Sequence, residues 1–487
     1  MRKYLSIGSA FLLGAGSMAL VNAAAHANAT AKPETFHMLE LFGDVLTTVE
    51  HQYVTPVDDK KLIQSAIDGM LTSLDPHSGY LDPENFDDMR DQTRGEYGGL
   101  GLEVTAEDGV VKVVSPMDDT PAARAGLKPG DYITAIDGQS VLGLPLDEAV
   151  KQMRGDVGQP ITLSIAREKH DPFDVKLVRE TIAVKSVRSR MEGDYGYVRI
   201  SSFNEKTGQE TADAVKGLLQ KNPRMKGLVL DLRRNPGGLL DQAVAVSDLF
   251  LDGGEIVSQR GRDPKDIERY NARPGDILEG RPIAVLIDSG TASAAEIVSG
   301  ALQDRHRAEL VGLTSFGKGS VQSVIPLRGG ADGALKLTTA RYYTPSGRSI
   351  QKTGISPDLE VAETGEQAKL IASRSFQFSE ASFRNALNAQ EGKARIAPHK
   401  PAEAPPPGFD EKTGDYQLTR AIALLKAGSV EALIKEQPPT AVAVVASAKT
   451  EPSSAKTGVV TSEGRAVPSR QLNPPEIARP KAPAKPK

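Results

Sequence analysis

Two stretches of the chain combine a short apolar run with a helical pattern further on. Residues 226–233 and 282–287 are rich in apolar residues and have the length of buried strands. A glycine-containing turn follows each run, and apolar residues then recur at helical spacing from near Leu240 and from Ala294. Both stretches are therefore predicted to fold as strand, turn and helix.

Residues 35–95 contain two further helical patterns. The first stripe consists of Phe36, Leu39, Phe42, Val45 and Leu46, and the second consists of Leu62, Ile63, Ala66, Ile67 and Met70. Both stripes predict helices that need an apolar partner, because one face of each would otherwise meet water. The sequence leaves open whether that partner is the rest of the chain or a second subunit.

Residues 96–183 have a different pattern, in which a glycine-rich loop runs into a strand. The loop residues are Gly99, Leu100, Gly101 and Leu102. Successive N–H groups of such a loop can hold a peptide's terminal carboxylate, while the following strand pairs with the peptide backbone. A helix predicted over 145–153 offers the other wall of the groove. We take the four loop residues as candidate peptide-binding residues, although the same apolar residues also build the core of this small domain.

Small residues surround Ser293, where the strand at 282–287 gives way to its helix, and Lys318 follows in a Gly-Lys-Gly turn. A serine hydroxyl is a weak nucleophile that needs a base, and a lysine serves as one when burial or nearby positive charge lowers its pKa. Gln322 can orient or desolvate the lysine amine through its amide oxygen. These residues predict a serine nucleophile with a lysine base.

The turn after the strand at 226–233 supplies what acyl transfer also needs. It contains Pro236, Gly237 and Gly238, and consecutive glycines let backbone N–H groups face a substrate carbonyl. The first N–H groups of a helix are unpaired and point toward an anion. Gly237 or Gly238, together with the N–H of Ala294, are therefore the candidate oxyanion hole.

Each signal has a structural alternative when it is taken alone. The serine segment resembles a helix cap, the Pro-Gly-Gly segment a turn, and the Gly-Lys-Gly segment a surface loop. Lys318 could also suggest a nucleotide-binding P-loop. Residues 316–320 lack the first glycine and the adjacent Lys-Ser/Thr pair of that motif, so nucleotide binding by a P-loop is excluded. None of the seven histidines lies in a comparable motif. The order of the signals, each at the end of a predicted strand, favours catalysis.

These motifs resemble the carboxy-terminal processing, or tail-specific, serine protease family. The matching stretches are residues 74–81, 231–238, 290–296, 317–322, 339–351 and 354–358. The resemblance covers about residues 35–365. It implies that Ser293 is the nucleophile, Lys318 the general base and Gln322 the residue that positions the lysine. It also implies a multidomain α/β chain whose core is related to the crotonase-like or Clp-protease-like fold.

Within the same match, residues 121–131 and 133–138 resemble a PDZ domain, which would be inserted ahead of the core. The resemblance further implies that the helical N-terminal region caps the protease or helps it to pair with a second subunit. A metal is not expected, because Asp75 and His77 in the segment 74–78 make a weak ligand set and a structural turn explains them. No cofactor is expected.

The N-terminus has the features of an export signal. Arg2 and Lys3 precede an apolar run at residues 5–21, and small residues end at Ala29. We predict a signal peptide cleaved near Ala29 and an exported, periplasmic protein, with peripheral membrane association left open. An uncleaved anchor is the alternative, but the run is short and contains Gly and Ser.

Composition narrows the function classes. The 487 residues contain no Cys, which excludes disulfides and thiolate metal sites, and the length favours several domains. The net charge is −4, Trp is absent, and no basic patch alternates with aromatic residues, so nucleic-acid binding is not expected.

The predicted division of the chain follows these changes in pattern. It comprises a signal peptide (1–29), a helical N-terminal region (30–95), a PDZ domain (96–183), a Ser-Lys protease core (184–365), a helical C-terminal region (366–437) and a tail rich in Pro, Ala and Lys (438–487). The tail cannot bury enough apolar surface to offset the entropy of ordering it, so it is predicted to be disordered.

The function that these observations favour is a serine endopeptidase that binds C-terminal tails of exported proteins in the PDZ groove and cleaves them through an acyl-enzyme. The alternative is a non-catalytic periplasmic PDZ scaffold or holdase. A crotonase-type acyl-CoA enzyme does not fit the export signal and the PDZ insert. The expected partners are protein or peptide substrates with exposed C-termini, and an adaptor protein and a homo-oligomer stay open.

Overall fold

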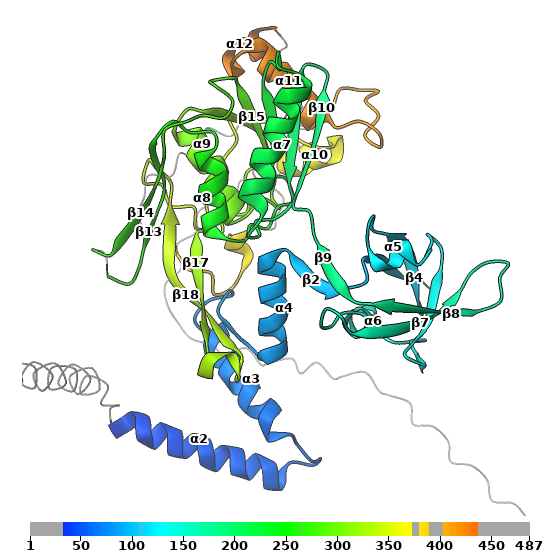
Figure 1. The fold of residues 1–487 in the computed structure, drawn as a ribbon. Helices are drawn as coiled ribbons and strands as arrows, with labels where there is room; N and C mark the ends of the chain where they lie inside the picture. The colour runs from blue at the N-terminus through cyan, green and yellow to red at the C-terminus, as the bar shows by residue number, and fades with distance from the viewer. Residues whose placement is uncertain (1–32, 108, 264, 373–378, 389–402, 437–487) are drawn as a thin grey trace, which may run out of the picture. The chain divides into compact units, whose positions relative to one another are not determined.

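The protein is described by a computed structural model. The described residues are 33–107, 109–263, 265–372, 379–388 and 403–436 (Figure 1). The predicted signal peptide and the predicted disordered tail lie outside these residues.

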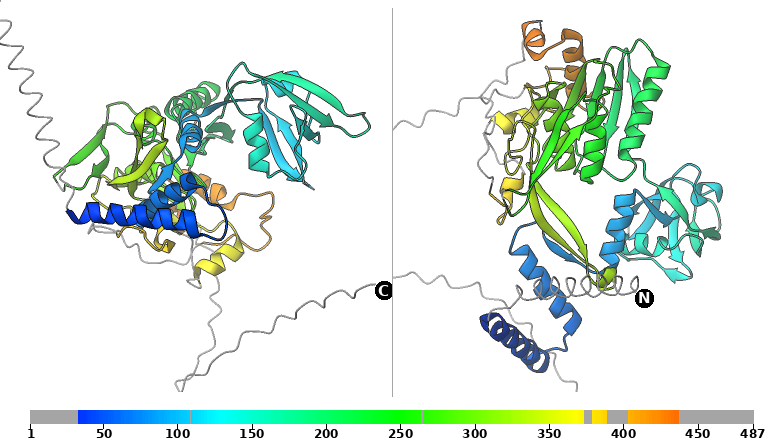
Figure 2. Two further views of the ribbon diagram at one scale, coloured as in Figure 1. Left: turned by 90° about the horizontal axis from the view of Figure 1, so that it is seen from below. Right: turned by 60° about the vertical axis from the view of Figure 1, so that its left-hand side comes forward.

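The core is a six-stranded sheet with helices on both faces (Figures 1 and 2). In spatial order its strands are β10 (Val187–Glu192), β11 (Tyr195–Ile200), β12 (Leu228–Asp231), β15 (Ile283–Ile287), β16 (Ala308–Gly312) and β19 (Leu359–Glu360). β10 is antiparallel to β11, and every other neighbouring pair is parallel. Because the carboxyl ends of parallel neighbours lie together, the turns after β12 and β15 meet at one edge of the sheet.

Alternate residues of the central strands face two apolar layers. On one face, Leu228 and Leu230 of β12 pack in the cluster that contains the helices α7 (Thr207–Lys221), α8 (Leu240–Asp248) and α9 (Ala294–Asp304). On the other face, Val229 packs with α11 (Tyr416–Ala427) and α12 (Val430–Glu436). Burial on both faces explains why β12 and β15 read as continuous apolar runs rather than as alternating ones.

A second, antiparallel sheet includes the strand that follows the turn containing Lys318. Its strands are β1 (Gly79–Leu81), β18 (Ala334–Tyr343), β13 (Gly254–Arg260) and β14 (Ile267–Ala272) in that order, with β17 (Ser320–Pro326) also paired to β18. β17 begins two residues after Lys318. β1 pairs Gly79 with Lys336 of β18, so the N-terminal region contributes a strand to this sheet.

A separate small sheet has its own apolar core. It contains β3 (Leu102–Glu107), β4 (Val110–Pro116), β5 (Tyr132–Ile136), β7 (Pro160–Ala166) and β8 (Phe173–Val178), with β6 (Gln139–Ser140) paired to β5 and the helices α5 (Pro121–Arg124) and α6 (Leu146–Met153). β2 (Glu96–Gly99) and β9 (Glu180–Ala183) pair with each other at the two ends of this segment. The chain therefore enters and leaves the domain side by side, as an insertion requires.

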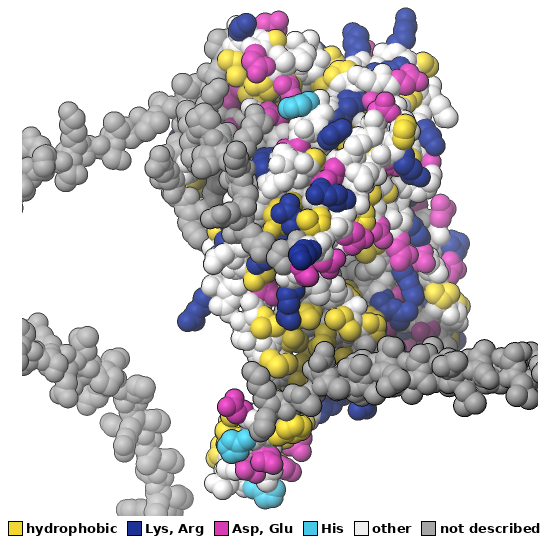
Figure 3. Space-filling view, turned by 90° about the vertical axis from the view of Figure 1, so that its left-hand side faces the viewer, with side chains coloured by type: hydrophobic (Ala, Val, Ile, Leu, Met, Phe, Trp, Pro, Cys, Tyr) yellow, Lys and Arg dark blue, Asp and Glu magenta, His cyan; other side chains and the backbone are white. Residues whose placement is uncertain are grey.

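The N-terminal region is helical, as predicted. Its helices are α2 (Pro33–Gln52), α3 (Asp59–Thr72) and α4 (Pro83–Arg94). Apolar residues of the first stripe are exposed, with Phe36 59% and Leu39 61% accessible, and hydrophobic and acidic side chains lie together at the lower end of Figure 3. No described helix is both long and apolar enough to cross a membrane.

The C-terminal region is also partly helical. It comprises α10 (Gly365–Ala372), the short 3-10 helix η2 (Glu380–Ser382), α11 and α12. The apolar pattern over 416–425 predicts α11, and the structure adds its caps. Asp415 accepts a hydrogen bond from the N–H of Leu418, and Gly428 ends the helix in a left-handed conformation.

Candidate active site

Ser293 occupies a strained position between β15 and α9. Its backbone angles are φ 54° and ψ −115°, and the residue is buried, with only 8% of its surface exposed. L-residues rarely adopt such angles, and strain of this kind clusters at functional sites. The sequence predicts the strand, the turn and the helix, but it does not reveal the strain.

Three hydrogen bonds join the turns that follow β12 and β15. The N–H of Arg234 donates to Asp288 Oδ1 at 2.9 Å, and Thr291 Oγ1 donates to the carbonyl of Leu232 at 2.9 Å. The N–H of Ala292 donates to the carbonyl of Asn235 at 2.9 Å. The predicted nucleophile segment and the glycine turn are therefore held side by side.

The glycine turn touches Ser293 directly. A Cβ atom at Gly237 would lie 2.8 Å from Ser293 Cβ and 2.9 Å from the nitrogen of Ala294. The N–H of Gly237 already donates to Asn235 Oδ1 at 2.9 Å. Among the described residues, the N–H groups of Gly238 and Ala294 have no hydrogen-bond partner. Of the two candidate glycines, Gly238 is thus the one whose N–H is available.

Glu296 links the serine turn to the lysine turn, and sequence reasoning missed this role. Its side chain is fully buried and accepts hydrogen bonds from the N–H of Ser293 at 2.8 Å and of Lys318 at 2.9 Å. The N–H of Gly317 and the hydroxyl of Ser315 donate to the same carboxylate. Burial raises the pKa of Glu296 to about 7, against the opposing effect of these hydrogen bonds. An acidic residue three positions after a helix cap was the available signal.

Lys318 lies partly buried in the turn before β17. Burial, together with the positive charge of Lys336, lowers the pKa of Lys318 to about 8, while Glu380, Glu296 and Asp75 act in the opposite direction. A lysine with such a pKa has an appreciable neutral fraction near physiological pH and can accept a proton.

Gln322 lies on β17, and its amide is oriented by two hydroxyl groups. Its Nε2 donates to Ser320 Oγ at 2.9 Å and to Thr338 Oγ1 at 3.2 Å. The hydroxyl of Thr338 then donates to Asp75 Oδ1 at 3.0 Å. This leaves the amide oxygen of Gln322 as an acceptor.

One cavity of about 820 Å³ brings the predicted catalytic residues together. Its lining includes Ser293, Lys318, Gln322, Gly237, Gly238 and Lys336. Within the described residues, no hydrogen bond joins Ser293 Oγ to Lys318 Nζ or Lys318 to Gln322. Catalytic hydrogen bonds often tighten only once substrate is bound.

The segment 74–78 forms a turn, as the sequence predicts. Asp75 accepts hydrogen bonds from the N–H groups of His77 and Ser78 and from the hydroxyl of Ser78. These bonds and that of Thr338 keep the pKa of Asp75 below its usual value, although burial opposes them. The described residues contain no group of three or more His, Cys, Asp or Glu placed to hold a metal ion.

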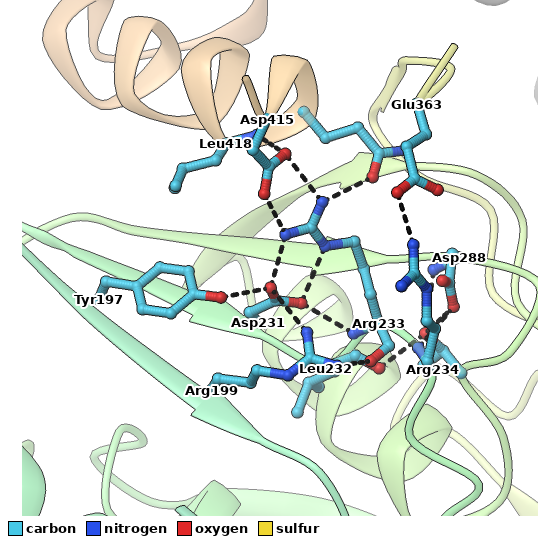
Figure 4. A network of polar contacts seen from close by, with 12 residues as sticks. Tyr197, Arg199, Asp231, Leu232, Arg233, Arg234, Asp288, Glu363, Asp415 and Leu418 are labelled. Carbon is cyan, nitrogen blue, oxygen red and sulfur yellow. Dashed lines mark hydrogen bonds and ion pairs between the residues drawn. The ribbon is translucent and has the colours of Figure 1, made fainter. Parts of the chain in front are cut away.

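An ionic network centred on Arg233, just before the glycine turn, connects β12 with the start of α11 (Figure 4). Arg233 donates to both carboxylate oxygens of Asp231 and to both of Asp415, which caps α11. Tyr197 and Arg199 also donate to Asp231. Although burial opposes it, the pairing with Arg233 keeps the pKa of Asp231 below its usual value. The C-terminal helix is thereby connected to the residue that precedes the turn.

The candidate peptide-binding loop runs from Gly99, the last residue of β2, to Leu102, the first residue of β3. Gly101 has φ 73°, and a Cβ atom there would lie 2.3 Å from Thr120 Cβ. The carbonyls of Leu100 and Gly101 accept hydrogen bonds from Ala122 and Met117, respectively. Within the described structure, the N–H groups of Leu100 and Gly101 have no partner and can meet a carboxylate. Leu100 and Leu102 pack against the apolar core of the domain.

Comparison with known proteins identifies the family. Residues 194–361 match peptidase family S41, residues 112–167 match the PDZ domain, and residues 10–85 match the N-terminal domain of the activating protease CtpB. The chain is 57% identical over 332 residues to a carboxy-terminal-processing protease of Bartonella bacilliformis. The aligned stretch covers 68% of this chain and 76% of that protein. The chain belongs to the carboxy-terminal processing proteases.

Further relatives of this carboxy-terminal processing protease are known. It is 38% identical over 324 residues to the carboxy-terminal processing protease CtpA of Bacillus subtilis, covering 66% of this chain and 68% of that protein. Among solved structures, a photosystem II D1 C-terminal processing protease matches with 29% identity and a TM-score of 0.40, covering 68% of this chain and 94% of that chain. The predicted family, the α/β fold class and the PDZ domain are confirmed.

Replacing Gly237 by alanine is expected to lower the rate of cleavage by about 100-fold, because the new methyl group would push against Ser293 and Ala294. Gly253→Ala is the matched control. Gly253 has φ 95°, close to the 97° of Gly237, but a Cβ atom there would meet no described residue within 4 Å. The rate of cleavage per folded molecule, measured with the unstructured protein casein as the substrate, checks this prediction. Equal decreases of this rate in both variants would contradict it.

Proposed function

We propose that this protease is a serine endopeptidase in which Ser293 is the nucleophile and Lys318 the general base. The observation that carries the proposal is the strained Ser293 on the wall of the same cavity as a partly buried lysine whose pKa is lowered to about 8. Nucleophilic serines need a nearby base, and a lysine becomes one only when its pKa approaches the working pH. Gln322 then positions the amine through its amide oxygen.

Each step of the reaction can be assigned to a residue. Ser293 Oγ attacks the peptide carbonyl carbon as Lys318 Nζ takes the hydroxyl proton, and the N–H groups of Gly238 and Ala294 stabilise the oxyanion. When the C–N bond breaks, Lys318 returns the proton to the leaving amine and an acyl-enzyme remains. Water, deprotonated by Lys318, then attacks the ester, and the proton passes back to Ser293.

The PDZ domain supports a substrate class. We propose that the N–H groups of the loop 99–102 bind the terminal carboxylate of an exported protein and that β3 pairs with its backbone. Binding of this kind delivers the C-terminal region of the substrate to Ser293. We further propose that the chain is exported to the periplasm and that its signal peptide is cleaved near Ala29, with the domain boundaries given above. An adaptor and self-association are open to test.

The proposal can be tested by trapping the acyl-enzyme and mapping the fragments. The purified chain is incubated with casein, an unstructured protein, and both the fragment ends and the intact mass of the enzyme are measured by mass spectrometry. We expect cleavage, and an acyl adduct on the peptide that contains Ser293. If the chain binds C-terminal peptides without ever cutting, the non-catalytic scaffold or holdase replaces the proposal.

The pH dependence follows from Lys318. Its amine must be neutral to act as a base, so kcat/KM is expected to rise with pH through a midpoint near 8. Below pH 7 the slope is expected to steepen, because Glu296, whose pKa burial raises to about 7, then takes up a proton, and this weakens the hydrogen bonds that its carboxylate accepts from the N–H groups of Ser293 and Lys318. Lys336→Gln removes a positive charge and should move the midpoint to higher pH. A profile that is flat between pH 6 and 9 would contradict this assignment.

A further inference from the structure

Glu380 is a fully buried carboxylate that the proposed mechanism does not use. It lies in the C-terminal region, yet its side chain is held by residues from two distant parts of the chain. Glu380 Oε2 is 2.8 Å from His77 Nε2, and Glu380 Oε1 accepts a hydrogen bond from Gln351 Nε2 at 2.8 Å. A buried charge needs such partners, because its transfer out of water is costly.

The contacts of Glu380 converge on the turn that contains Lys318. The N–H of Glu380 donates to the carbonyl of Phe316 at 3.0 Å, two residues before the lysine. Gln351, also fully buried, accepts a hydrogen bond from the N–H of Gly319 at 3.0 Å, one residue after it. Both sides of Lys318 are therefore connected to Glu380, one directly and the other through Gln351.

Aromatic packing and a close backbone approach reinforce this arrangement. The ring of Phe383 makes edge contacts with Phe316 and His77, at centroid distances of 6.1 and 6.0 Å. A Cβ atom at Gly319 would lie 2.4 Å from the nitrogen of Gln351, so the lysine turn and the Gln351 backbone are in close contact. A shift of the segment at 380–383 would thus be transmitted to the turn.

We propose that Glu380 is a positioning residue of the protease: through Phe316 and Gln351 it holds the turn that carries Lys318, and through His77 it ties that turn to the N-terminal region. The proposal rests on the proposed role of Lys318 as the base. It makes the docking of residues 379–388 a condition for an ordered lysine, so segments that precede and follow the site in sequence both contribute to it.

Glu380 also acts on Lys318 through its charge. Four ionisable groups from separate elements influence the amine: Lys336 of β18 favours its neutral form, whereas Glu296 of α9, Asp75 and Glu380 favour the ammonium ion. Loss of the negative charge of Glu380 should therefore let Lys318 lose its proton at lower pH. A residue that served only to stabilise the fold would not move the pH profile in this way.

The test compares Glu380→Gln, Glu380→Ala and the control Glu411→Gln in the purified chain, with casein as the probe. Glu411 is an exposed carboxylate of the same C-terminal region that accepts a hydrogen bond from Gly365, and within the described part of the chain no hydrogen bond or ion pair joins it to the lysine turn. We expect Glu380→Gln, which keeps the size and most hydrogen bonds, to move the rising limb of kcat/KM to lower pH. Glu380→Ala should lower kcat by about 10- to 100-fold with a smaller change in KM.

The outcomes separate this inference from the proposed function. The inference is overturned if the pH profile of kcat/KM rises at the same pH in Glu380→Gln as in the wild type. It is also overturned if kcat per folded molecule is unchanged in Glu380→Ala. If Glu380→Ala does not fold, the pH profile of Glu380→Gln decides alone. Persistent cleavage by Ser293→Ala would instead remove the proposed function, whatever the Glu380 variants do.

Discussion

Replacing Ser293 by alanine is expected to reduce kcat for casein cleavage by about 10⁴-fold or more, because the variant lacks the atom that forms the acyl-enzyme. Lys318→Ala should cause a loss of similar size, since the hydroxyl would then have no base. Lys318→Arg should not restore activity, because a guanidinium does not deprotonate in proteins. The measurement is the rate of appearance of new fragment ends by mass spectrometry.

Two controls sharpen the test of Ser293. Ser289→Ala removes a hydroxyl that is exposed and lies only four residues away, and it should leave the rate close to that of the wild type. The double variant Ser293→Ala/Lys318→Ala should be hardly slower than either single variant, because residues that act in one step are not additive. Cleavage by Ser293→Ala at a comparable rate would show that another residue is the nucleophile.

Replacing Arg233 by alanine is expected to lower the free energy of unfolding of the core by about 3–5 kcal/mol, because it leaves a buried carboxylate without its main partner. Asp231 is fully buried and, among the described residues, would keep only Tyr197 and Arg199 as side-chain partners. The lost bonds to Asp415 would also release the end of α11 from the strand. Urea denaturation, monitored by circular dichroism, measures the effect.

Arg234→Ala is the matched control for the loss at Arg233. The Arg234 side chain is 67% exposed and pairs with Glu363 at the surface, so its removal should change the free energy of unfolding by less than about 1 kcal/mol. Replacing Asp231 and Arg233 together by Leu and Met should cost less than Arg233→Ala alone, since no unpaired charge is then buried. Equal losses in Arg233→Ala and Arg234→Ala would contradict the role given to the network.

The candidate site could be predicted from local sequence because each of its parts is a short contiguous segment. The apolar run at 282–287, the small residues that follow and the helical pattern from Ala294 place Ser293 at a strand-to-helix turn, which the structure contains. Gly237 and Gly238 follow β12 in the same way. Such patterns depend on backbone freedom and on the burial of neighbouring residues, which the local sequence encodes.

Contacts between distant segments could not be predicted from one sequence. Glu296 reads as part of a helix cap, but its four donors come partly from residues 315–318. Asp415 and Glu380 lie far along the chain, among residues whose pattern predicts only helices and turns. Nothing in the local sequence of either residue indicates that it contacts Arg233 or the lysine turn.

The sequence by itself therefore determined the family motifs, the order of the domains and the identity of the candidate nucleophile and base. Only the tertiary structure decided how Lys318 is buried beside Lys336, which N–H groups of the glycine turn are unpaired, and which distant carboxylates hold the serine and lysine turns. The physical reason is that burial, charge proximity and hydrogen bonding depend on separations in space, whereas a sequence pattern reports only separations along the chain.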